Sequence, residues 1–397
     1  MMNAMMRRTV AVMALASASA LTMSTKGPLV TSGLSRRNLL GAAAAVGGGG
    51  ALAPAAARAA SAPAPPKVFS PAPGTLADRT ILITGANTGL GLESAVRLAA
   101  AGADVVVTAR TAAKVDATVA AVRARAGAGA RVRGAELDLA SLASVRGFRA
   151  RLRAAKVDRL DVLLNNAGVM AIPERLATRD GFERQIGVNH LGHFALVGEL
   201  LPLLRTAKKG AEPRPFRVIN VASTAQFGAS AAGLRDALDR DLEPAYSQWG
   251  NYCLSKAANV LFADELQRRF DAAGVRASAV SLHPGAVATD LARYLVSGTE
   301  AAEAGASSAE AFAAFNPLQR GALQAVRAFV LDVPEGASTQ VYLAAGADTA
   351  DGDLGAHGGL YYDRQRPATP NPATNDREIA RRLWEVSEKL TGAKIVI

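Results

Sequence analysis

Tyr252 and Lys256 are the two residues whose types and spacing first suggest chemistry. In a helix, residues four positions apart lie on one face about one turn apart, so a tyrosine hydroxyl and a lysine ammonium can point at one ligand. Most pairs with this spacing, however, belong to a solvated helix surface. The pair therefore predicts proton transfer only if other segments of the chain place a cofactor and a substrate beside it.

The composition indicates a globular protein. Half of the 397 residues are hydrophobic, which is enough to bury a sizeable core. The single cysteine, Cys253, excludes an internal disulfide framework and a cysteine-built zinc site. The four histidines form no evident ligand cluster, so we predict no metal site.

The net charge of +11 is concentrated at the start of the chain. Residues 1–60 contain six basic residues and no acid, so the remaining residues carry a net charge of +5. That excess is ordinary for a domain that binds an anionic cofactor. Because no basic stripe is interleaved with aromatic residues, we predict no nucleic-acid partner.

Residues 1–60 are typical of a targeting leader. Two signal-like units follow one another, MRRTVAVMALASASA and SRRNLLGAAAAVGGGGALAPAAARAASA, each with a basic start, an apolar run and small-residue cleavage sites. Arg36 and Arg37 form a twin-arginine pair, which is typical of export in the folded state. The tandem predicts a plastid protein bound for the thylakoid. The alternatives are bacterial export to the periplasm from a start at Met23, or an uncleaved anchor, for which the apolar run is short.

From Arg79 onward, short apolar runs alternate with longer segments rich in Ala, Leu and Arg. The runs predict strands at 80–84, 104–109, 131–137, 161–165, 216–223 and 276–282. The longer segments predict helices at 89–101, 111–126, 141–154, 180–206 and 250–273. Continuously apolar strands separated by helices indicate a parallel sheet covered on both faces. We therefore predict a doubly wound α/β (Rossmann) fold in a single domain, residues 77–397, after a proline-rich linker at 61–76.

The turn after the first predicted strand has the sequence TGANTGLG (84–91). Ligands bind such sheets beyond the carboxyl ends of the strands. Gly85 permits a tight turn, while Gly89 and Gly91 let the backbone and a helix N-terminus approach a pyrophosphate. The turn therefore predicts a dinucleotide site. The residues assigned to it are Gly85, Asn87, Thr88, Gly89, Leu90 and Gly91.

The end of the second predicted strand indicates which dinucleotide binds. The glycine spacing departs from G-x-G-x-x-G, and the acid expected about 20 residues later to hold a ribose hydroxyl is missing. The segment TART instead places Arg110 where a 2′-phosphate would lie, which favours NADP(H) over NAD. The alternative is a solvated arginine at a helix start.

The turns after the later strands supply the remaining candidates. Asp138, next to Leu139, is placed to accept from an adenine amino group or to cap the following helix. NNAG contributes a small backbone beside the nicotinamide, with Asn166, Ala167 and Gly168. HPGAVATD (283–290) supplies groups that can hold a carboxamide, from Pro284, Gly285, Val287 and Thr289.

Five motifs in order, TGANTGLG, NNAG, Ser223, YCLSK and HPG, resemble the short-chain dehydrogenase/reductase family over residues 77–365. Each motif is modest, but five at the correct strand ends are specific. The segment DGFERQIGVNHLGHFAL (180–196) further resembles the retinol dehydrogenase-like branch, which is related to the protochlorophyllide reductases.

The resemblance implies a proton relay that interconverts a hydrophobic carbonyl and its alcohol with NADP(H). Tyr252 would be the acid or base at the substrate oxygen. Lys256 and the oxidised nicotinamide would lower its pKa from the ordinary value of about 10. Ser223 would hydrogen-bond the carbonyl, and Asn189 would hold a water that links the lysine to solvent. Tyr252 and Lys256 would also contact the cofactor.

Two alternative functions stay open. One is a pigment reductase of the protochlorophyllide reductase type, although NNAG matches the general family better. The other is a non-catalytic NADPH-binding redox sensor or scaffold. The presence of Ser223, Tyr252 and Lys256 together argues against it, because a sensor does not need an acid.

The remaining segments concern the substrate and partners. Residues 289–319 form an insertion at the position of the family's substrate lid, and its apolar side chains predict a small hydrophobic substrate. The tail 376–390 predicts an amphipathic helix packed on the body or on a homodimer partner, and we expect association with a membrane surface. His190, His193 and Cys253 are interpreted as packing residues.

Overall fold

The computed structural model describes residues 68–204, 215–287, 331–347 and 358–397, with the single residues 291, 294, 299, 300 and 302. The predicted leader (1–60) and the first part of the predicted linker (61–67) lie outside these ranges, as do Thr289 and most of the predicted lid.

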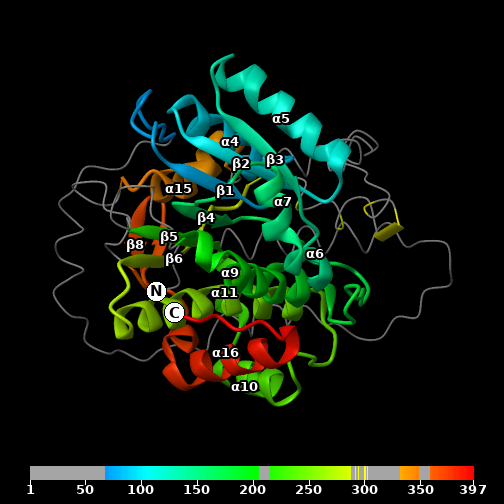
Figure 1. The fold of residues 1–397 in the computed structure, drawn as a ribbon. Helices are drawn as coiled ribbons and strands as arrows, with labels where there is room; N and C mark the ends of the chain where they lie inside the picture. Colours follow the sequence, from blue (N-terminus) through cyan, green and yellow to red (C-terminus); the bar gives the residue numbers. More distant parts are fainter. Residues whose placement is uncertain are drawn as a thin grey trace, which may run out of the picture.

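One sheet forms the centre of the fold, with its eight strands in the order β3-β2-β1-β4-β5-β6-β7-β8 (Figure 1). Every neighbouring pair is parallel except β7 and β8. The strands are β1 (Thr80–Ile83), β2 (Asp104–Ala109), β3 (Val132–Glu136), β4 (Val162–Asn165), β5 (Phe216–Val221), β6 (Ala277–His283), β7 (Tyr361–Asp363) and β8 (Arg366–Ala368). The strand order reverses between β1 and β4, so the ligand crevice of such a sheet lies at their carboxyl ends.

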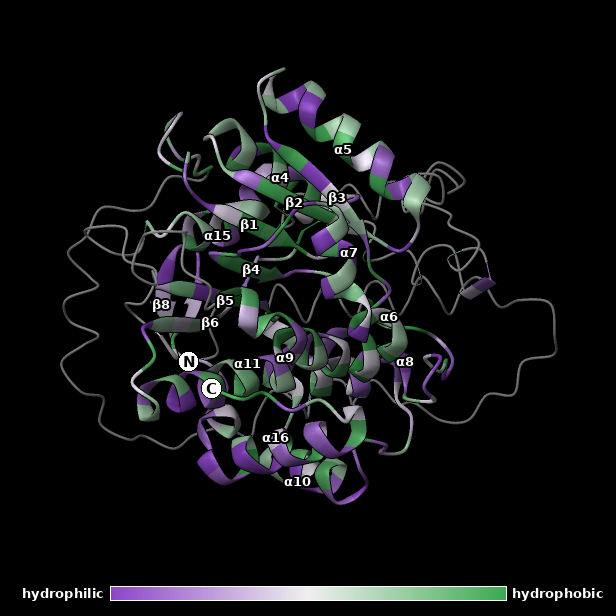
Figure 2. Cartoon of the chain, in the orientation of Figure 1, coloured by the Kyte–Doolittle hydropathy of each residue, from purple (hydrophilic) through white to green (hydrophobic). Residues whose placement is uncertain are grey.

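Helices cover both faces of the sheet, which confirms the predicted doubly wound α/β fold. One face carries α4 (Gly89–Ala100), α5 (Ala112–Ala126) and α15 (Val333–Ala344). The other carries α6 (Leu142–Arg146), α7 (Phe148–Ala154), α9 (Gly192–Leu204) and α11 (Gln248–Ala272). Side chains of β1 alternate between these faces, with Ile81 and Ile83 in one core and Leu82 in the other. Figure 2 shows the apolar strands enclosed by helices of mixed polarity.

Some helices differ from the prediction. The segment predicted as one helix at 141–154 is two, α6 and α7, with Gly147 between them, where glycine disfavours a continuous helix. The segment predicted at 180–206 contains α8 (Arg184–Ile186), the π-turn η1 (Gly187–Leu191) and α9. Three elements were not predicted, namely α10 (Ala231–Asp239), α15 and the β7–β8 hairpin. Each of those two strands has only three residues, too few to form a recognisable apolar run.

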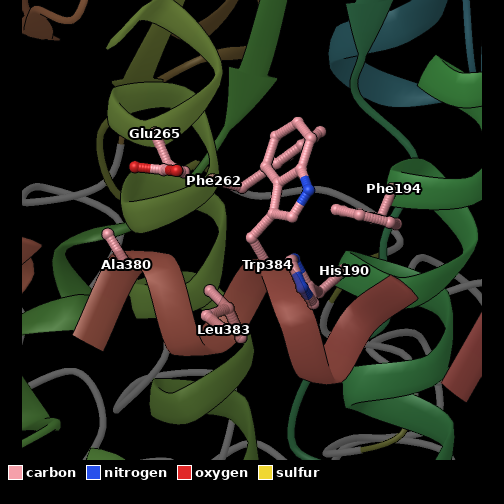
Figure 3. Close-up of a pocket in the computed structure, with 7 residues that line it drawn as sticks. All are labelled: His190, Phe194, Phe262, Glu265, Ala380, Leu383 and Trp384. Atoms are coloured by element: carbon pink, nitrogen blue, oxygen red, sulfur yellow. The ribbon is translucent and has the colours of Figure 1, made fainter. Parts of the chain in front are cut away.

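The C-terminal helix α16 (Arg377–Thr391) packs on α9, α10 and α11. The amphipathic tail is thus confirmed, and it covers the body of its own chain. Figure 3 shows Trp384 against two aromatic rings, with centroid distances of 5.2 Å to Phe194 and 5.9 Å to Phe262. Within the described ranges, no helix is long and apolar enough to cross a membrane.

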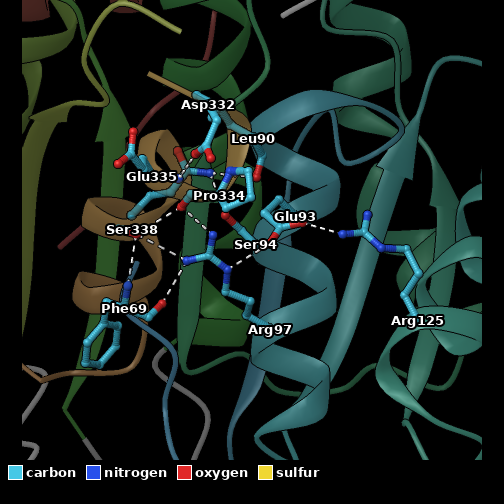
Figure 4. A network of polar contacts seen from close by, with 11 residues as sticks. Phe69, Leu90, Glu93, Ser94, Arg97, Arg125, Asp332, Pro334, Glu335 and Ser338 are labelled. Atoms are coloured by element: carbon cyan, nitrogen blue, oxygen red, sulfur yellow. Dashed lines mark hydrogen bonds and ion pairs between the residues drawn. The ribbon is translucent and has the colours of Figure 1, made fainter. Parts of the chain in front are cut away.

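The final residues of the predicted linker pack on the helices beside the sheet. The Phe69 N–H donates to Ser338 Oγ of α15 at 3.0 Å. Arg97 of α4, only 7% exposed, donates to the Phe69 carbonyl at 2.8 Å and to the Pro334 carbonyl. Its Nε also pairs with Glu93 at 2.9 Å (Figure 4). The buried guanidinium of Arg97 therefore joins the segment before β1, helix α4 and the start of α15.

Replacing Arg97 should lower the free energy of unfolding more than replacing Arg125, the second arginine that pairs with Glu93. Arg97→Met should lower the free energy of unfolding by at least about 3 kcal/mol, because two carbonyls and Glu93 lose a buried cation. Arg125→Met is the matched control. Arg125 also pairs with Glu93, but its side chain is 48% exposed, so its loss should cost less than about 1 kcal/mol. Urea unfolding of both variants measures the difference, and equal losses would contradict a structural role for the Arg97 network.

Candidate active site

The turn between β1 and α4 lies at the reversal of strand order. Gly85 and Gly89 have φ angles of +63° and +52°, which favour glycine. A Cβ on Gly85 would lie 2.9 Å from Ala167, and one on Gly91 would lie 2.4 Å from the Gly85 carbonyl oxygen. These glycines therefore let the turn close on itself and on NNAG, which fixes the position of the start of α4.

The N-terminus of α4 suits an anionic group. Thr88, at the N-cap, makes no side-chain capping hydrogen bond, and the first turn of this 12-residue helix has no acid. The amides of that turn, at the positive end of the helix dipole, can therefore receive a pyrophosphate. Asn87 and Leu90 are half-buried on either side, so both predicted residues border this position.

Arg110 follows β2, with an exposed side chain. Among the described residues, no hydrogen bond or ion pair occupies its guanidinium, so the arginine suits an anionic ligand group. Asp138, by contrast, accepts from the Ala140 N–H at 3.0 Å and lies 3.7 Å from Arg179 Nη2. It thus stabilises its own turn, while Leu139 beside it is buried.

The NNAG turn is held directly against β1. The Thr84 hydroxyl oxygen accepts from the backbone N–H groups of Asn166 and Ala167, at 2.9 and 3.0 Å. The Asn166 side chain donates to the Thr84 and Gly85 carbonyls, at 2.8 and 3.2 Å. A Cβ on Gly168 would lie 3.6 Å from Lys256 Nζ. The small backbone of this turn therefore leaves room beside the lysine.

Ser223, Tyr252 and Lys256 lie close to one another in the structure. Tyr252 and Lys256 are on α11 and are only 2% and 3% exposed. Ser223 follows β5, caps the short helix η2 (Thr224–Gly228) by accepting from the Ala225 N–H at 3.1 Å, and shares a hydrogen bond with Tyr252. Lys256 Nζ donates to the Val221 carbonyl at 3.0 Å and lies 5.7 Å from the Tyr252 ring centroid. The arrangement can hold and move a proton.

Burial controls the acid–base properties of this group. Burial raises the pKa of Tyr252, and the hydrogen bond from Ser223 partly opposes that effect. Burial also lowers the pKa of Lys256, to about 8. Both shifts favour the neutral form of the side chain. A tyrosinate at neutral pH would therefore need additional positive charge beside it.

Asn189 is fully buried, and its side chain joins two parts of the site. Its Oδ1 accepts from the Val169 N–H at 2.8 Å, and its Nδ2 donates to the Val169 carbonyl and to Ser255 Oγ, both at 2.9 Å. Ser255 Oγ in turn donates to the Tyr252 carbonyl at 2.8 Å. The Asn189 amide thus connects the NNAG turn to the Tyr252 turn of α11. Its role in holding a water stays a prediction.

The turn after β6 lies at the same carboxyl edge of the sheet. Gly285 has a φ of +91°, and its N–H donates to His283 Nδ1 at 3.0 Å. Pro284 lies between them. Val287 pairs with Leu331 in a parallel bridge, so the turn contacts the start of the segment that leads into α15. Of the predicted residues in this turn, only Thr289 lies outside the described ranges.

Comparison with known proteins gives concordant results. Residues 79–234 match the family model described as short chain dehydrogenase. Human retinol dehydrogenase 13 is 36% identical over 324 residues, 81% of this chain and 87% of that protein. Mouse polyprenol dehydrogenase is 39% identical over 329 residues, 83% of this chain and 87% of that protein. The chain belongs to the short-chain dehydrogenase/reductase family, in its retinol dehydrogenase-like branch.

Solved structures agree with this assignment. An uncharacterized protein from Mycobacterium paratuberculosis is 32% identical, with a TM-score of 0.58 over 83% of this dehydrogenase and 100% of that chain. The RhlG/NADP complex from Pseudomonas aeruginosa is 27% identical, with a TM-score of 0.50 over 72% of this chain and 94% of that chain. The protein is thus an oxidoreductase of alcohol or carbonyl groups that uses a nicotinamide cofactor.

Several residues that support the site of this dehydrogenase were missed by the sequence analysis. Thr84, Ser255 and His283 lie within the motifs TGANTGLG, YCLSK and HPG. Their place in these motifs was the signal that could have identified them. Gln340 of α15 donates to the Leu90 carbonyl at 3.1 Å and to Ser94 Oγ at 2.7 Å, thereby supporting the cofactor turn from a distant segment. No local pattern could have indicated that contact.

The close packing of the cofactor turn predicts the effect of a single methyl group. Gly91→Ala would place a Cβ against backbone and against Asn166, so the turn must shift. We expect nicotinamide-nucleotide affinity to fall at least about 5-fold, since overpacking typically costs about 1–3 kcal/mol. Gly129→Ala is the control, because open space surrounds that position. Fluorescence titration measures both affinities. Unchanged binding by Gly91→Ala would show that the packed turn does not define the cofactor site.

Proposed function

We propose that this dehydrogenase uses NADP(H) to interconvert a small hydrophobic carbonyl compound and its alcohol, through Ser223, Tyr252 and Lys256. The observation that carries the proposal is that Ser223, just beyond the carboxyl end of β5, meets Tyr252 and Lys256 of α11. Tyr252 and Lys256 are buried and Ser223 is half-buried, and the hydrogen bonds described above hold them in place. The glycine turn, the uncapped start of α4 and the NNAG backbone form a cradle that fits a dinucleotide.

In this proposal, each protein group has one role. Tyr252 donates its hydroxyl proton to the carbonyl oxygen in reduction and accepts the alcohol proton in oxidation. Ser223 hydrogen-bonds the same oxygen and stabilises the charge that develops on it. Lys256 places an ammonium near the Tyr252 ring, which favours the tyrosinate against the effect of burial. The cofactor, when bound, supplies or takes up the hydride.

The preference for NADP(H) rests on Arg110. It stands at the end of β2, exposed and free of an ion-pair partner within the described residues, and β2 ends in TAR without the acid that would bind a ribose hydroxyl. A guanidinium offers a fork of donors that matches phosphate geometry. The RhlG relative, whose structure is titled as an NADP complex, supports the same assignment.

The hydrophobic substrate rests on the relatives and on the insertion. The relatives are named as dehydrogenases of retinol and of polyprenol, both long apolar alcohols. The insertion at 289–319 adds apolar side chains at the position where the family places its substrate lid. A retinol dehydrogenase-like activity therefore accounts for both better than a small polar substrate does.

The proton-transfer role is tested by removing one oxygen atom. Tyr252→Phe should keep nucleotide binding and lose at least about 100-fold in kcat/KM, because the phenyl ring retains the packing but carries no proton. Tyr342→Phe, on the α15 face of the sheet, is the control and should leave kcat/KM unchanged. Steady-state kinetics with a hydrophobic aldehyde measures both variants. A Tyr252→Phe enzyme as fast as the wild type would exclude Tyr252 as the acid.

The cofactor preference is tested at Arg110. Arg110→Ala should weaken NADPH binding about 10-fold or more and leave NADH binding unchanged, since a hydrogen bond to a charged group contributes about 1.5–3 kcal/mol. Arg240→Ala, at an exposed arginine that follows α10 as its C-cap, is the control for loss of surface charge. Parallel titrations with both nucleotides give the ratio of affinities. A ratio that Arg110→Ala leaves at its wild-type value would refute the assignment.

A further inference from the structure

His193 lies between the cofactor turn and the segment that carries Asn189. Its Nε2 is 2.9 Å from the Thr84 hydroxyl oxygen, and its Nδ1 is 3.0 Å from the Asn189 carbonyl oxygen. All three residues are buried. The imidazole is therefore a direct bridge between the end of β1 and the π-turn η1.

The partners of the ring determine where its proton lies. A carbonyl oxygen only accepts, so Nδ1 must carry the hydrogen and donate to Asn189. Nε2 of the neutral ring then accepts, and the Thr84 hydroxyl donates to it. The Thr84 oxygen is simultaneously the acceptor for two backbone N–H groups of the NNAG turn. Burial lowers the pKa of His193 to about 4, with the nearby charge of Lys256 acting in the same direction, so this arrangement holds at neutral pH.

The bridge is continuous with the relay residues. From Thr84 it passes through His193 to the backbone of Asn189. The Asn189 side chain then reaches Ser255, which bonds the Tyr252 carbonyl. Asn189 stands in a π-turn, whose closing bond runs from the Gly192 N–H to the Gly187 carbonyl, and such turns are frequent at functional sites.

We propose that His193 is a positioning residue. It fixes the position of the cofactor turn at the end of β1 relative to Asn189 and, through Asn189, relative to Tyr252. It does not touch the reacting atoms. The inference rests on the proposed function, in which those two parts hold the nucleotide and the proton donor. Loss of the imidazole should therefore affect nucleotide binding and turnover together.

His190 provides a matched control on the same helical segment. It is also a buried histidine, and its Nε2 lies 2.8 Å from Ser387 Oγ of α16. Its other neighbours include Phe194, Phe262 and Trp384 (Figure 3). It therefore contributes to the attachment of α16, and in the part of the chain that the structure describes it makes no hydrogen bond to the cofactor turn.

The experiment compares His193→Phe with His190→Phe in the full-length protein, measuring NADPH affinity by fluorescence titration and kcat with a hydrophobic aldehyde. His193→Phe should weaken NADPH binding at least about 5-fold and lower kcat at least about 10-fold, because small misplacements at a reacting centre are costly. His193→Gln, which keeps a donor and an acceptor, should recover part of both losses. His190→Phe should lower thermal stability and leave both quantities unchanged.

A double-mutant cycle tests whether His193 acts through Thr84. In a Thr84→Val background, replacing His193 by glutamine should change NADPH affinity less than about 2-fold, because the hydroxyl partner is already gone. Additive effects, or a His193→Phe variant that only loses stability as His190→Phe does, would overturn the inference. If His193→Phe does not fold, the glutamine variant and this cycle carry the test.

The two proposals fail in different ways. A wild-type protein that binds NADPH without turning over any carbonyl or alcohol would contradict the proposed function, while the affinity measurements would still test the role of His193. Normal turnover and affinity in both His193 variants would overturn the inference alone. A wild-type protein that binds neither nucleotide would overturn both.

Discussion

The buried amide of Asn189 is the interaction on which the geometry of the site depends. It bonds both backbone groups of Val169 and the hydroxyl of Ser255, so one side chain ties the turn after β4 to the part of α11 that carries Tyr252. Those two segments belong to different crossovers of the sheet, one that follows β4 and one that joins β5 to β6. Without such a tie, the nicotinamide half of a cofactor and the tyrosine would each depend on a separate element for position.

The tie works because the surrounding backbone packs closely. Glycines at 85 and 91 bring the turn after β1 against the turn after β4, and Gly168 leaves space next to Lys256. Each added methyl group would meet backbone or a functional side chain. The glycine pattern therefore reflects contacts within the protein as much as the approach of a phosphate, which is the reason usually given for glycines in such turns.

The burial that holds the site residues in place also disfavours their charged forms. Tyr252 and Lys256 are almost completely removed from solvent, and burial disfavours the charged form of each. A relay in this environment depends on charges that lie beside it, such as that of an oxidised nicotinamide. The proposed relay therefore requires the cofactor, Ser223 and Lys256 to lie beside Tyr252, because a buried tyrosine alone would stay protonated at neutral pH.

Much of this architecture could be predicted from the sequence, and the limits have physical causes. The six long strands and the motifs at their ends were predicted because apolar β-branched runs and glycine turns are local signals. The β7–β8 hairpin and α15 were missed because three-residue strands and a helix containing Pro334 and Gly336 carry no strong local pattern. His193 was interpreted as a packing residue, since a sequence does not show that its two nitrogens meet Thr84 and Asn189 across the crevice.

Turnover of defined substrates tests whether Ser223, Tyr252 and Lys256 perform alcohol and carbonyl chemistry with NADP(H). The wild-type protein would be assayed at the nicotinamide absorbance with NADPH and NADH against retinal, a steroid ketone and a porphyrin precursor. We expect NADPH-dependent reduction of a hydrophobic carbonyl such as retinal, with NADH the poorer cofactor. Nucleotide binding without turnover of any compound would contradict it in favour of a sensor or scaffold, and turnover of the porphyrin precursor alone would favour a pigment reductase.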